Sequence, residues 1–490
     1  MMTVRNQVHF SSRRVGARVL CAAMALACVS AVHAQSGNPS SATNPYFGSV
    51  TLHPATDEVL QLSLDDAVRR GLDNNLGLRE AEAGEKQVLG QKNQALQEFL
   101  PTITVSGGTG VFQHNLAALG FNAGVIDSFK SVFPGGTIPA GLTTITRDDL
   151  TQGQVGYSQT LFSGPVIAGW RAAGAAQKAA HFATTRARGE VVQQVATAYL
   201  HAIAAASEVD QAKALQDADQ VLFDQAHASH LAGTVANLDE LRARVQLQAQ
   251  EQAVISAQNT LDKDLILLKR EIGVDPGQKM ILTDATPYAE LAEQTPEEVR
   301  AVALKNRQDY QNLQNQLVEV RAIHGAYRSQ RLPVLKFDGS YGVDKINGMP
   351  SRGLFSAVGT LSFPIFNEAK LRGDEESAEA QLDSVREQLE DLRGHIDQQV
   401  RSALMDVATT HKLVEVGRSN VELATRELSD ETDRVSAGVD DNLPLVDAQA
   451  TLASAQNNLI ESLYQYNLSK LALARAAGIL EQQYRVYLGR

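Results

Sequence analysis

The sequence predicts a mainly α-helical protein with a small β part, arranged as two tandem repeats of long antiparallel coiled-coil helices and paired strands. Three observations predict this fold class. Hydrophobic residues make up 43% of the 490 residues, but aromatic residues only 5%, which suits long helices packed through small side chains. The same order of motifs occurs twice along the chain. Within each copy the apolar spacing changes from the helical period to a period of two, which indicates strands.

The two copies emerge when the sequence is compared with itself. Residues of the first copy match residues 232, 204 or 205 positions later, as in the pairs Pro101 and Pro333, Phe162 and Phe366, and Gly233 and Gly438. We therefore assign 63–290 to the first repeat and 291–480 to the second. An extended segment, 35–62, precedes them, and a C-terminal tail, 481–490, follows. The first copy is the longer one, because it holds a Gly-rich loop near residues 114–150.

The first 34 residues have the pattern of a secretory signal peptide. A basic start and an apolar run precede Val32 and Ala34, small residues at the −3 and −1 positions of a cut before Gln35. Two alternatives are an uncleaved anchor, which the run is too short to form because a spanning helix needs ~20 apolar residues, and lipid attachment at Cys28. Cys21 and Cys28 are the only cysteines, so the mature chain is expected to lack disulfides.

Each repeat opens with a capped helix that ends at a Leu-Pro pair. Ser63 begins the first, and Thr295 begins the second with Pro296 and Glu298 behind it, the pattern of a capping box. We expect helices over about 64–100 and 296–332, because proline lacks an amide donor and keeps the residue before it out of helical angles.

Four segments after these helices alternate between apolar and polar residues, which predicts strands at about 102–113, 152–162, 333–343 and 354–363. Each strand has one apolar face, although Gln159 interrupts that of the second. The polar faces are rich in hydroxyl groups and glycine. The residues expected to form the lipid-facing side are Ile103, Val105, Leu335, Phe337, Phe355 and Phe363.

Proline-free stretches after the strands predict the longest helices. We expect helices at about 166–232 and 237–272, joined at Gly233, and at about 367–437 and 443–477, joined at Gly438. The first would reach about 100 Å at the α-helical rise. Apolar residues along these stretches follow the spacing of a coiled-coil seam. Taken alone, the helices favour a soluble antiparallel coiled coil.

The strands favour a membrane protein instead. About ten residues suffice for a tilted strand to cross a bilayer, and alternation is the pattern of a transmembrane barrel. A small soluble sheet is the alternative, but the signal peptide and the lack of a helix suited to cover the apolar face count against it. Four strands cannot close a barrel, and open edges are not tolerated in hydrocarbon. Other copies of the chain must supply the remaining strands.

Several motifs, in the same order in both repeats, resemble the TolC family of outer-membrane efflux proteins. They begin with LSLDDAVRRGLDNNLGLREAEA and FLPTITVSGG and continue at the tips with HLAGTVANLDELRARVQL and RVSAGVDDNLPLVDAQATLASAQNNL. They close with LLKREIG and LALARAAG. The resemblance covers residues 60 to 480.

This resemblance implies a homotrimer with a twelve-stranded barrel in the outer membrane and a helical tube in the periplasm. The chain would then be the passive exit duct of a tripartite efflux or secretion system, gated at its periplasmic tip. Its partners would be a periplasmic adaptor protein, an inner-membrane transporter and outer-membrane lipid. The alternative is a soluble periplasmic coiled-coil protein with a structural or tethering role.

The resemblance also implies site residues. Acidic residues narrow the channel aperture in this family, and the matching positions are Asp447 and Asp239, with Asp440 and Asp441 nearby because Pro444 replaces one expected acid. The alternative is that these acids cap helices, where negative charge is favourable. Gly233 and Gly438 mark the helix tips that would dock the adaptor. Pro101 and Pro333 mark the helix-to-strand junctions.

Other classes of function lack support in the sequence. The formal charge is −12, and no basic stripe interleaved with aromatics occurs, so we expect no nucleic-acid partner. His227 and His230 lie three residues apart without a third ligand in sight, so we expect no metal site. We find no convincing nucleophile and base pair. We therefore expect neither an enzyme nor a bound cofactor.

Overall fold

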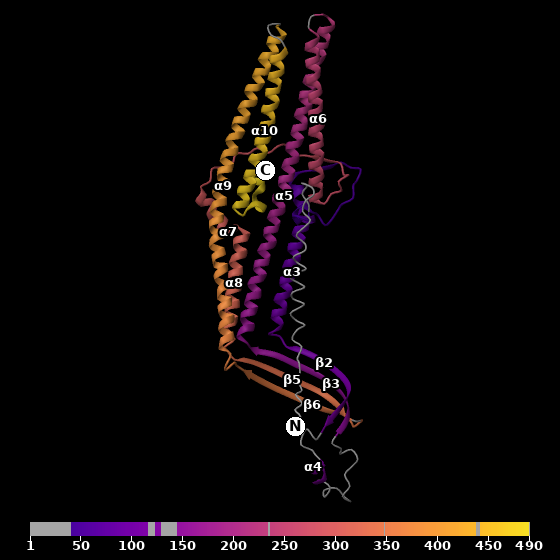
Figure 1. Cartoon of the computed structure of the whole chain (residues 1–490), viewed down its shortest axis with the longest axis vertical. Coiled ribbons are helices and arrows are strands. Elements are labelled where there is room, and N and C mark those ends of the chain that lie inside the picture. The colour runs from indigo at the N-terminus through magenta and orange to yellow at the C-terminus, as the bar shows by residue number, and fades with distance from the viewer. Residues whose placement is uncertain are drawn as a thin grey trace, which may run out of the picture.

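A computed structural model describes residues 41–115, 123–128, 145–233, 236–346, 348–437 and 442–489. A four-stranded sheet lies at one end and two helical hairpin tips at the other (Figure 1). The predicted fold class, mainly α with a small β part, is confirmed. The predicted signal peptide with Cys28 lies outside the described residues, and so do most of the long loop, Gly438, Asp440 and Asp441.

The elements of the described chain, in order, are η1 (Pro45–Phe47), β1 (Leu60–Leu62), α2 (Leu64–Asn74), α3 (Leu76–Gln97), β2 (Thr102–Asn115), α4 (Ala123–Ser128), β3 (Ile145–Phe162), α5 (Gly164–Leu231), α6 (Asn237–Ile272), β4 (Met280–Leu282), α7 (Pro296–Asn306), α8 (Gln308–Ser329), β5 (Val334–Ile346), β6 (Arg352–Ser362), α9 (Glu368–Ser436), α10 (Asn442–Ala476) and α11 (Leu480–Tyr487). None of these described helices has an apolar stretch long enough to cross a membrane.

The helix expected over 64–100 is divided at Asn75, which corrects the prediction. Asn75 has an extended backbone, with φ −66° and ψ 134°, and ends α2. Its buried side chain then starts α3, because Oδ1 accepts a hydrogen bond from the Leu78 amide at 3.2 Å. Nδ2 donates to the Tyr46 carbonyl at 2.7 Å. The break therefore depends on a segment 29 residues away.

The second repeat has the corresponding break at Arg307, so the single helix expected over 296–332 is also wrong. The predicted capping box of Thr295 and Glu298 is present at the start of α7. Arg307 leaves the helical conformation with φ −65° and ψ 125°. Its guanidinium donates to Asp309 at 2.6 Å and to Gln399 of α9 at 2.6 Å. Tertiary contacts thus stabilise this break as well.

A glycine at the end of each return helix packs against the break in its own repeat. Gly273 follows α6 with φ +76°, and a Cβ there would lie 2.5 Å from the Thr51 carbonyl oxygen and 3.0 Å from Asn74 Cβ. Gly478 follows α10 with φ +74°, and a Cβ there would lie 2.7 Å from the Arg307 nitrogen. Only glycine fits such a close approach at positive φ. Each return helix therefore ends beside the break in its own repeat.

The core lies in this middle region, where several short elements surround α5. Tyr199 is fully buried and donates a hydrogen bond to the Leu62 carbonyl at 2.9 Å, which ties α5 to the parallel pair β1 and β4. Residues expected to form a tail, 481–490, instead form most of α11. Its Tyr484 donates to Asp65 of α2 at 2.8 Å. Contacts between the two ends of the chain thus complete the core.

The four long strands form one antiparallel sheet in the order β2-β3-β5-β6. The predicted boundaries are shorter than the observed strands at several ends, most of all for β3, which begins at Ile145. The strands β3 and β5 join the two repeats. Within the described residues, β2 and β6 are the outer strands, and each leaves one backbone edge unpaired.

We predict that Gly478→Ala lowers the melting temperature of the purified protein in detergent. The added Cβ would collide with the Arg307 backbone at positive φ, a kind of strain that costs about 1 to 3 kcal/mol. The matched control is Gly174→Ala within α5, where a Cβ meets nothing within 4 Å. That change should raise stability by about 0.5 to 1 kcal/mol. Equal melting temperatures for both variants would contradict the proposed packing.

Candidate functional site

The long helices form a wall whose two sides belong to different repeats. On the sheet side α5 packs between α3 and α8, and α8 also packs against α9. On the tip side α5 packs between α6 and α10, and α10 also packs against α9. Among the described helices, α3 and α6 therefore end the wall on one side and α9 ends it on the other. Figure 1 shows α5 and α9 running from the sheet to the two tips.

One face of the sheet carries the apolar residues that the alternation predicted. Ile103 pairs with Tyr157, Val105 with Val155, and Val155 also with Tyr341. The side chains of Ile103 and Val105 are 66% and 81% exposed, and Phe355 and Phe363 are also exposed. Leu335 and Phe337 are half-buried, since the Tyr157 ring meets Phe337 edge-on at 5.8 Å. In a single chain this face is thus largely open.

Gln159 is the polar residue on that apolar face, and the structure satisfies its side chain. Its Oε1 accepts a hydrogen bond from the Tyr157 hydroxyl at 2.5 Å. Its Nε2 donates to the Phe99 carbonyl at 3.1 Å. A glutamine paired in this way costs much less than an unpaired one in an apolar setting. It connects β3 to the end of α3.

The two Leu-Pro pairs lie where helix changes to strand. Helix α3 ends at Gln97 and α8 at Ser329, and a turn then leads to Pro101 or Pro333. In both repeats the leucine amide still donates to a carbonyl three residues back, at 3.1 Å for Leu100 and 3.0 Å for Leu332. The strands start directly after the prolines. The prolines thus lie one turn beyond the helix ends, between helix and strand.

The described tip residues are less uniform than the sequence suggested. Gly233 ends the turn after α5 with φ +72°. Asp239 lies in the first turn of α6, 3.5 Å from Arg242. Asp447 has an exposed side chain on α10. Nothing in a single chain brings Asp239 and Asp447 together. Gly438, Asp440 and Asp441 fall outside the described residues.

Glu240 is a tip residue whose contacts were missed. Its side chain is buried between the two helices of the first tip, where Oε1 lies 3.0 Å from His227 Nδ1 and 3.4 Å from Arg244 Nη2. Its Oε2 lies 3.8 Å from His230 Nε2. Glu240 and His227 are nearly equidistant from the turn, and that relation could have indicated the contact. The cluster ties α6 to α5 at the tip.

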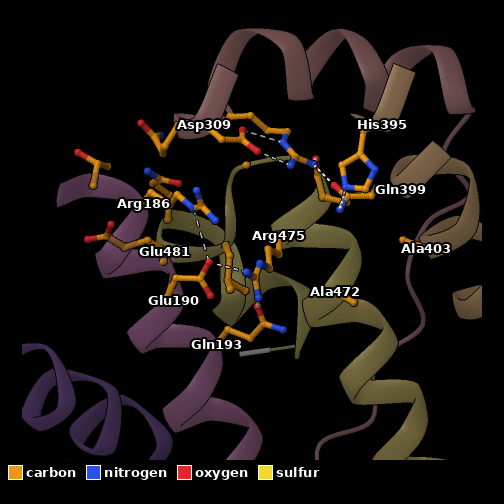
Figure 2. A pocket seen from close by; sticks show the side chains of 18 of the residues that line it. Arg186, Glu190, Gln193, Asp309, His395, Gln399, Ala403, Ala472, Arg475 and Glu481 are labelled. Carbon is orange, nitrogen blue, oxygen red and sulfur yellow. Dashed lines mark hydrogen bonds and ion pairs between the residues drawn. The ribbon is translucent and has the colours of Figure 1, made fainter. Parts of the chain in front are cut away.

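A polar cavity of about 680 Å³ opens in the middle of the wall, where α8 begins and α10 ends (Figure 2). Arg475 donates to Glu190 at 2.5 Å and also to Gln193, so it links α10 to α5. Arg188 donates to Glu481 of α11 at 2.8 Å. Positive and negative groups alternate around the cavity. This lining is suited to joining helices and lacks an excess of either charge.

Burial changes the pKa of several groups near this region. Burial alone would raise the pKa of Asp309, but hydrogen bonding to Arg307 and its positive charge overcome that effect and lower the pKa. Burial raises the pKa of Glu271 to about 7, opposed only by a hydrogen bond from Gln194. Burial also lowers the pKa of Lys470 to about 8. Lys470 donates to the Ala289 carbonyl at 3.1 Å, which holds the segment between the repeats.

The site chemistry is that of a wall with open sides. Within the part of the chain that the structure describes, no group of three or more His, Cys, Asp or Glu side chains could hold a metal ion. Exposed backbone edges, an exposed apolar sheet face and two polar tips dominate instead. Such features suit assembly and membrane contact.

Comparison with known proteins gives a family. The sequence model described as "Outer membrane efflux protein" matches residues 67–274 and 299–479, one segment in each repeat. The chain is 28% identical over 260 residues to the solvent efflux pump outer membrane protein SrpC of Pseudomonas putida, covering 51% of this chain and 54% of that protein. The aligned region thus spans about half the length of that relative.

Two further similarities extend over more of the chain. It is 23% identical over 370 residues to the outer membrane protein TolC of Escherichia coli, covering 69% of this chain and 71% of that one. The solved structure of the Campylobacter jejuni CmeC outer membrane channel superposes with a TM-score of 0.69 at 15% identity, covering 92% and 94%. At that identity the superposition establishes the fold. The predicted resemblance to TolC-type proteins is confirmed.

We predict that Glu271→Gln stabilises the protein more at pH 8 than at pH 5. Because burial raises the pKa of Glu271 from 4.5 to about 7, the folded state holds a proton that the unfolded state has lost between these values. Stability therefore falls as the pH rises from 4.5 to 7, by at most about 3 kcal/mol. Melting temperatures of both proteins from pH 5 to 8 measure the difference.

The matched control is Glu293→Gln, whose side chain is exposed. Its melting temperature should follow that of the parent at every pH. A constant difference between Glu271→Gln and the parent across this range would contradict the role assigned to burial.

Proposed function

We propose that this chain, which belongs to the outer membrane efflux protein family, is the outer-membrane exit duct of a tripartite efflux or secretion system. It would be a passive conduit across the outer membrane and the periplasm, gated at its periplasmic tip, with no catalytic step. The observation that carries the proposal is the sheet, which presents an apolar face and two unpaired edges at the end of a long helical wall.

The sheet supports a place in the outer membrane. Its apolar face, with Ile103 and Val105 most exposed, would contact lipid, together with Leu335, Phe337, Phe355 and Phe363. The opposite face carries Ser340 and Ser356, whose hydroxyls are 2.8 Å apart, and would line a lumen. Strands β2, β3, β5 and β6 have between 11 and 18 residues, enough to cross a bilayer when tilted.

The two sides of the wall support a ring of identical chains. An apolar stripe with the four- and three-residue spacing of a coiled-coil seam is exposed along α6, and apolar residues are exposed along α9 at the other side. The α6 residues are Leu241, Val245, Ile255 and Ile266, and the α9 residues are Met405, Leu413, Val416 and Leu423. A different surface on each side favours head-to-tail contact, which closes a ring.

The two apolar edges lie at similar heights along the hairpins. Gln250 of α6 donates to the Ala212 carbonyl of α5 at 3.0 Å, and the adjacent Gln211 donates to the Ala453 carbonyl of α10 at 3.0 Å. Leu452 of α10 packs against Ala424 of α9. Residues near 250 on α6 and near 424 on α9 are therefore level, and one copy could pack its α6 against α9 of the next.

The proposed assembly is a homotrimer that works with a periplasmic adaptor protein and an inner-membrane transporter. The tips at Gly233 and Gly438 would meet the adaptor. Asp447 and Asp239, with Asp440 and Asp441, would narrow the aperture when three copies meet, because several carboxylates around one axis attract cations. The exposed side chain of Asp447 leaves it free to face such a lumen. Export would use residues 1–34 as a signal peptide.

We predict that Ile255→Glu weakens trimer formation, because it places a charge in the apolar contact proposed between α6 and α9 of the next copy. Size-exclusion chromatography with light scattering in detergent should show a shift from trimer toward monomer. The control is Val302→Glu on α7, an exposed position away from α6 and the strand edges. If both variants stay trimeric, the α6 contact is not where we place it.

The proposed function predicts that the purified parent protein forms cation-selective channels in planar bilayers. Asp447→Asn should reduce the cation selectivity and weaken the block by multivalent cations, because it removes one charge per subunit from the aperture. Unchanged selectivity and block would reject the place of Asp447 in the lumen. A parent protein that is extracted without detergent and forms no pores would instead favour the coiled-coil tether.

A further inference from the structure

Two of the most exposed apolar side chains follow the outer strand β6. Ile365 is 89% exposed and Phe366 98% exposed, in the turn between β6 and α9. Strand β6 ends at Ser362 and leaves one edge unpaired within the described residues. Apolar side chains so fully exposed beside an open strand edge indicate a missing partner strand.

The internal duplication supplies a template for that partner. In the first repeat Ile103 of β2 lies opposite Tyr157 of β3. Residues 232 and 204 positions later, Leu335 of β5 and Leu361 of β6, also lie opposite each other. The two hairpins therefore have the same register. Each is one copy of the same structural unit, and the pair β3 and β5 is the junction between two units.

That junction has a defined register. Gln159 of β3 lies opposite Phe337 of β5, and Phe162 lies opposite Leu335 after an irregularity that leaves one residue, 161, without a partner. In a closed ring the junction between subunits joins the same two kinds of edge. The β3 side corresponds to β6, 204 residues later, and the β5 side corresponds to β2, 232 residues earlier.

We propose that β6 of one copy pairs with β2 of the next in this transferred register, with Phe363 opposite Val105 and Phe366 opposite Ile103. Strand β6 would then extend from Ser362 to Phe366, with a bulge at Ile365. The inference rests on the proposed function, because it concerns the junction that closes the ring. The partner is a second copy of this chain.

Two features of the chain agree with this register. The side chains that become opposite each other share the apolar face, since Phe363 and Leu361 meet Val105 and Gly107, whereas a shift of one residue would place apolar side chains against the polar face. The extended β6, from 353 to 366, also covers the whole of β2, from 103 to 115. Every outward backbone group along that length finds a partner.

The first repeat shows what pairing does to these side chains. Phe162, which corresponds to Phe366, lies on a paired strand and is 43% exposed, less than half the value for Phe366. Pairing thus leaves the aromatic ring partly open on the apolar face. The remaining area would contact lipid next to the junction.

Disulfide formation tests the register directly. Val105→Cys combined with Phe363→Cys should form intermolecular disulfides in membranes on mild oxidation, because opposed strand residues lie about 4.5 to 5.5 Å apart at Cα. An intramolecular bond cannot form, since β2 and β6 are separated by three strand spacings, roughly 14 Å. The linked peptides are identified by mass spectrometry, and the parent chain, with Cys21 and Cys28 alone, sets the background.

Two control pairs distinguish the register from general proximity. Val105→Cys with Ser362→Cys places the thiols on opposite faces, and Val105→Cys with Leu361→Cys shifts the pair by two residues to about 7 to 8 Å. Both should cross-link at least several-fold less. More cross-linking with Leu361→Cys, or none with any pair in a protein that is trimeric and conducts, would overturn the inference while the proposed function stands. A monomeric protein that does not conduct would overturn both.

Discussion

Backbone amide and carbonyl groups at the edge of a sheet must find partners when the sheet lies in hydrocarbon, and this requirement shapes the whole chain. Strands β2 and β6 each present an unpaired edge. A helix could cover such an edge in water, but the long helices continue away from the sheet (Figure 1). The chain thus meets the requirement only with other copies of itself. The different apolar sides of α6 and α9 extend the same dependence into the helical wall.

The middle region solves a second problem, which is how a wall of constant width is made from helices of different length. Helices α5 and α9 span the full length, whereas the other two positions in the wall are each filled by two shorter helices. Gly478 ends α10 against the backbone of Arg307, where α8 starts, and Gly273 ends α6 against Asn74. The negative end of one helix dipole then lies near the positive end of the next, a favourable arrangement. The short elements packed around α5 hold these ends in place.

Much of the fold was predictable because its signals are local. Alternation around Ile103 and Phe337 indicates strands, and Gly233 in a long helical stretch indicates a turn. The breaks at Asn75 and Arg307 were not predictable in this way, because neither residue is a helix breaker and both depend on distant partners, Tyr46 and Gln399. Helix α11 was missed for the same reason, since Tyr484 reaches an aspartate 419 residues away. At the tip, Glu240 has the pattern of a simple cap acid until the hairpin brings His227 beside it.

The number of copies in the ring follows from what the barrel must contain. Each chain contributes four strands, so two copies would give eight. An eight-stranded barrel is about wide enough for its own side chains to fill the interior, so it leaves no continuous passage. A third copy raises the count to twelve and widens the barrel, and the polar side chains of β2, β3, β5 and β6 can then line water. A passage therefore requires at least three copies, and the smallest ring that meets this condition is the trimer.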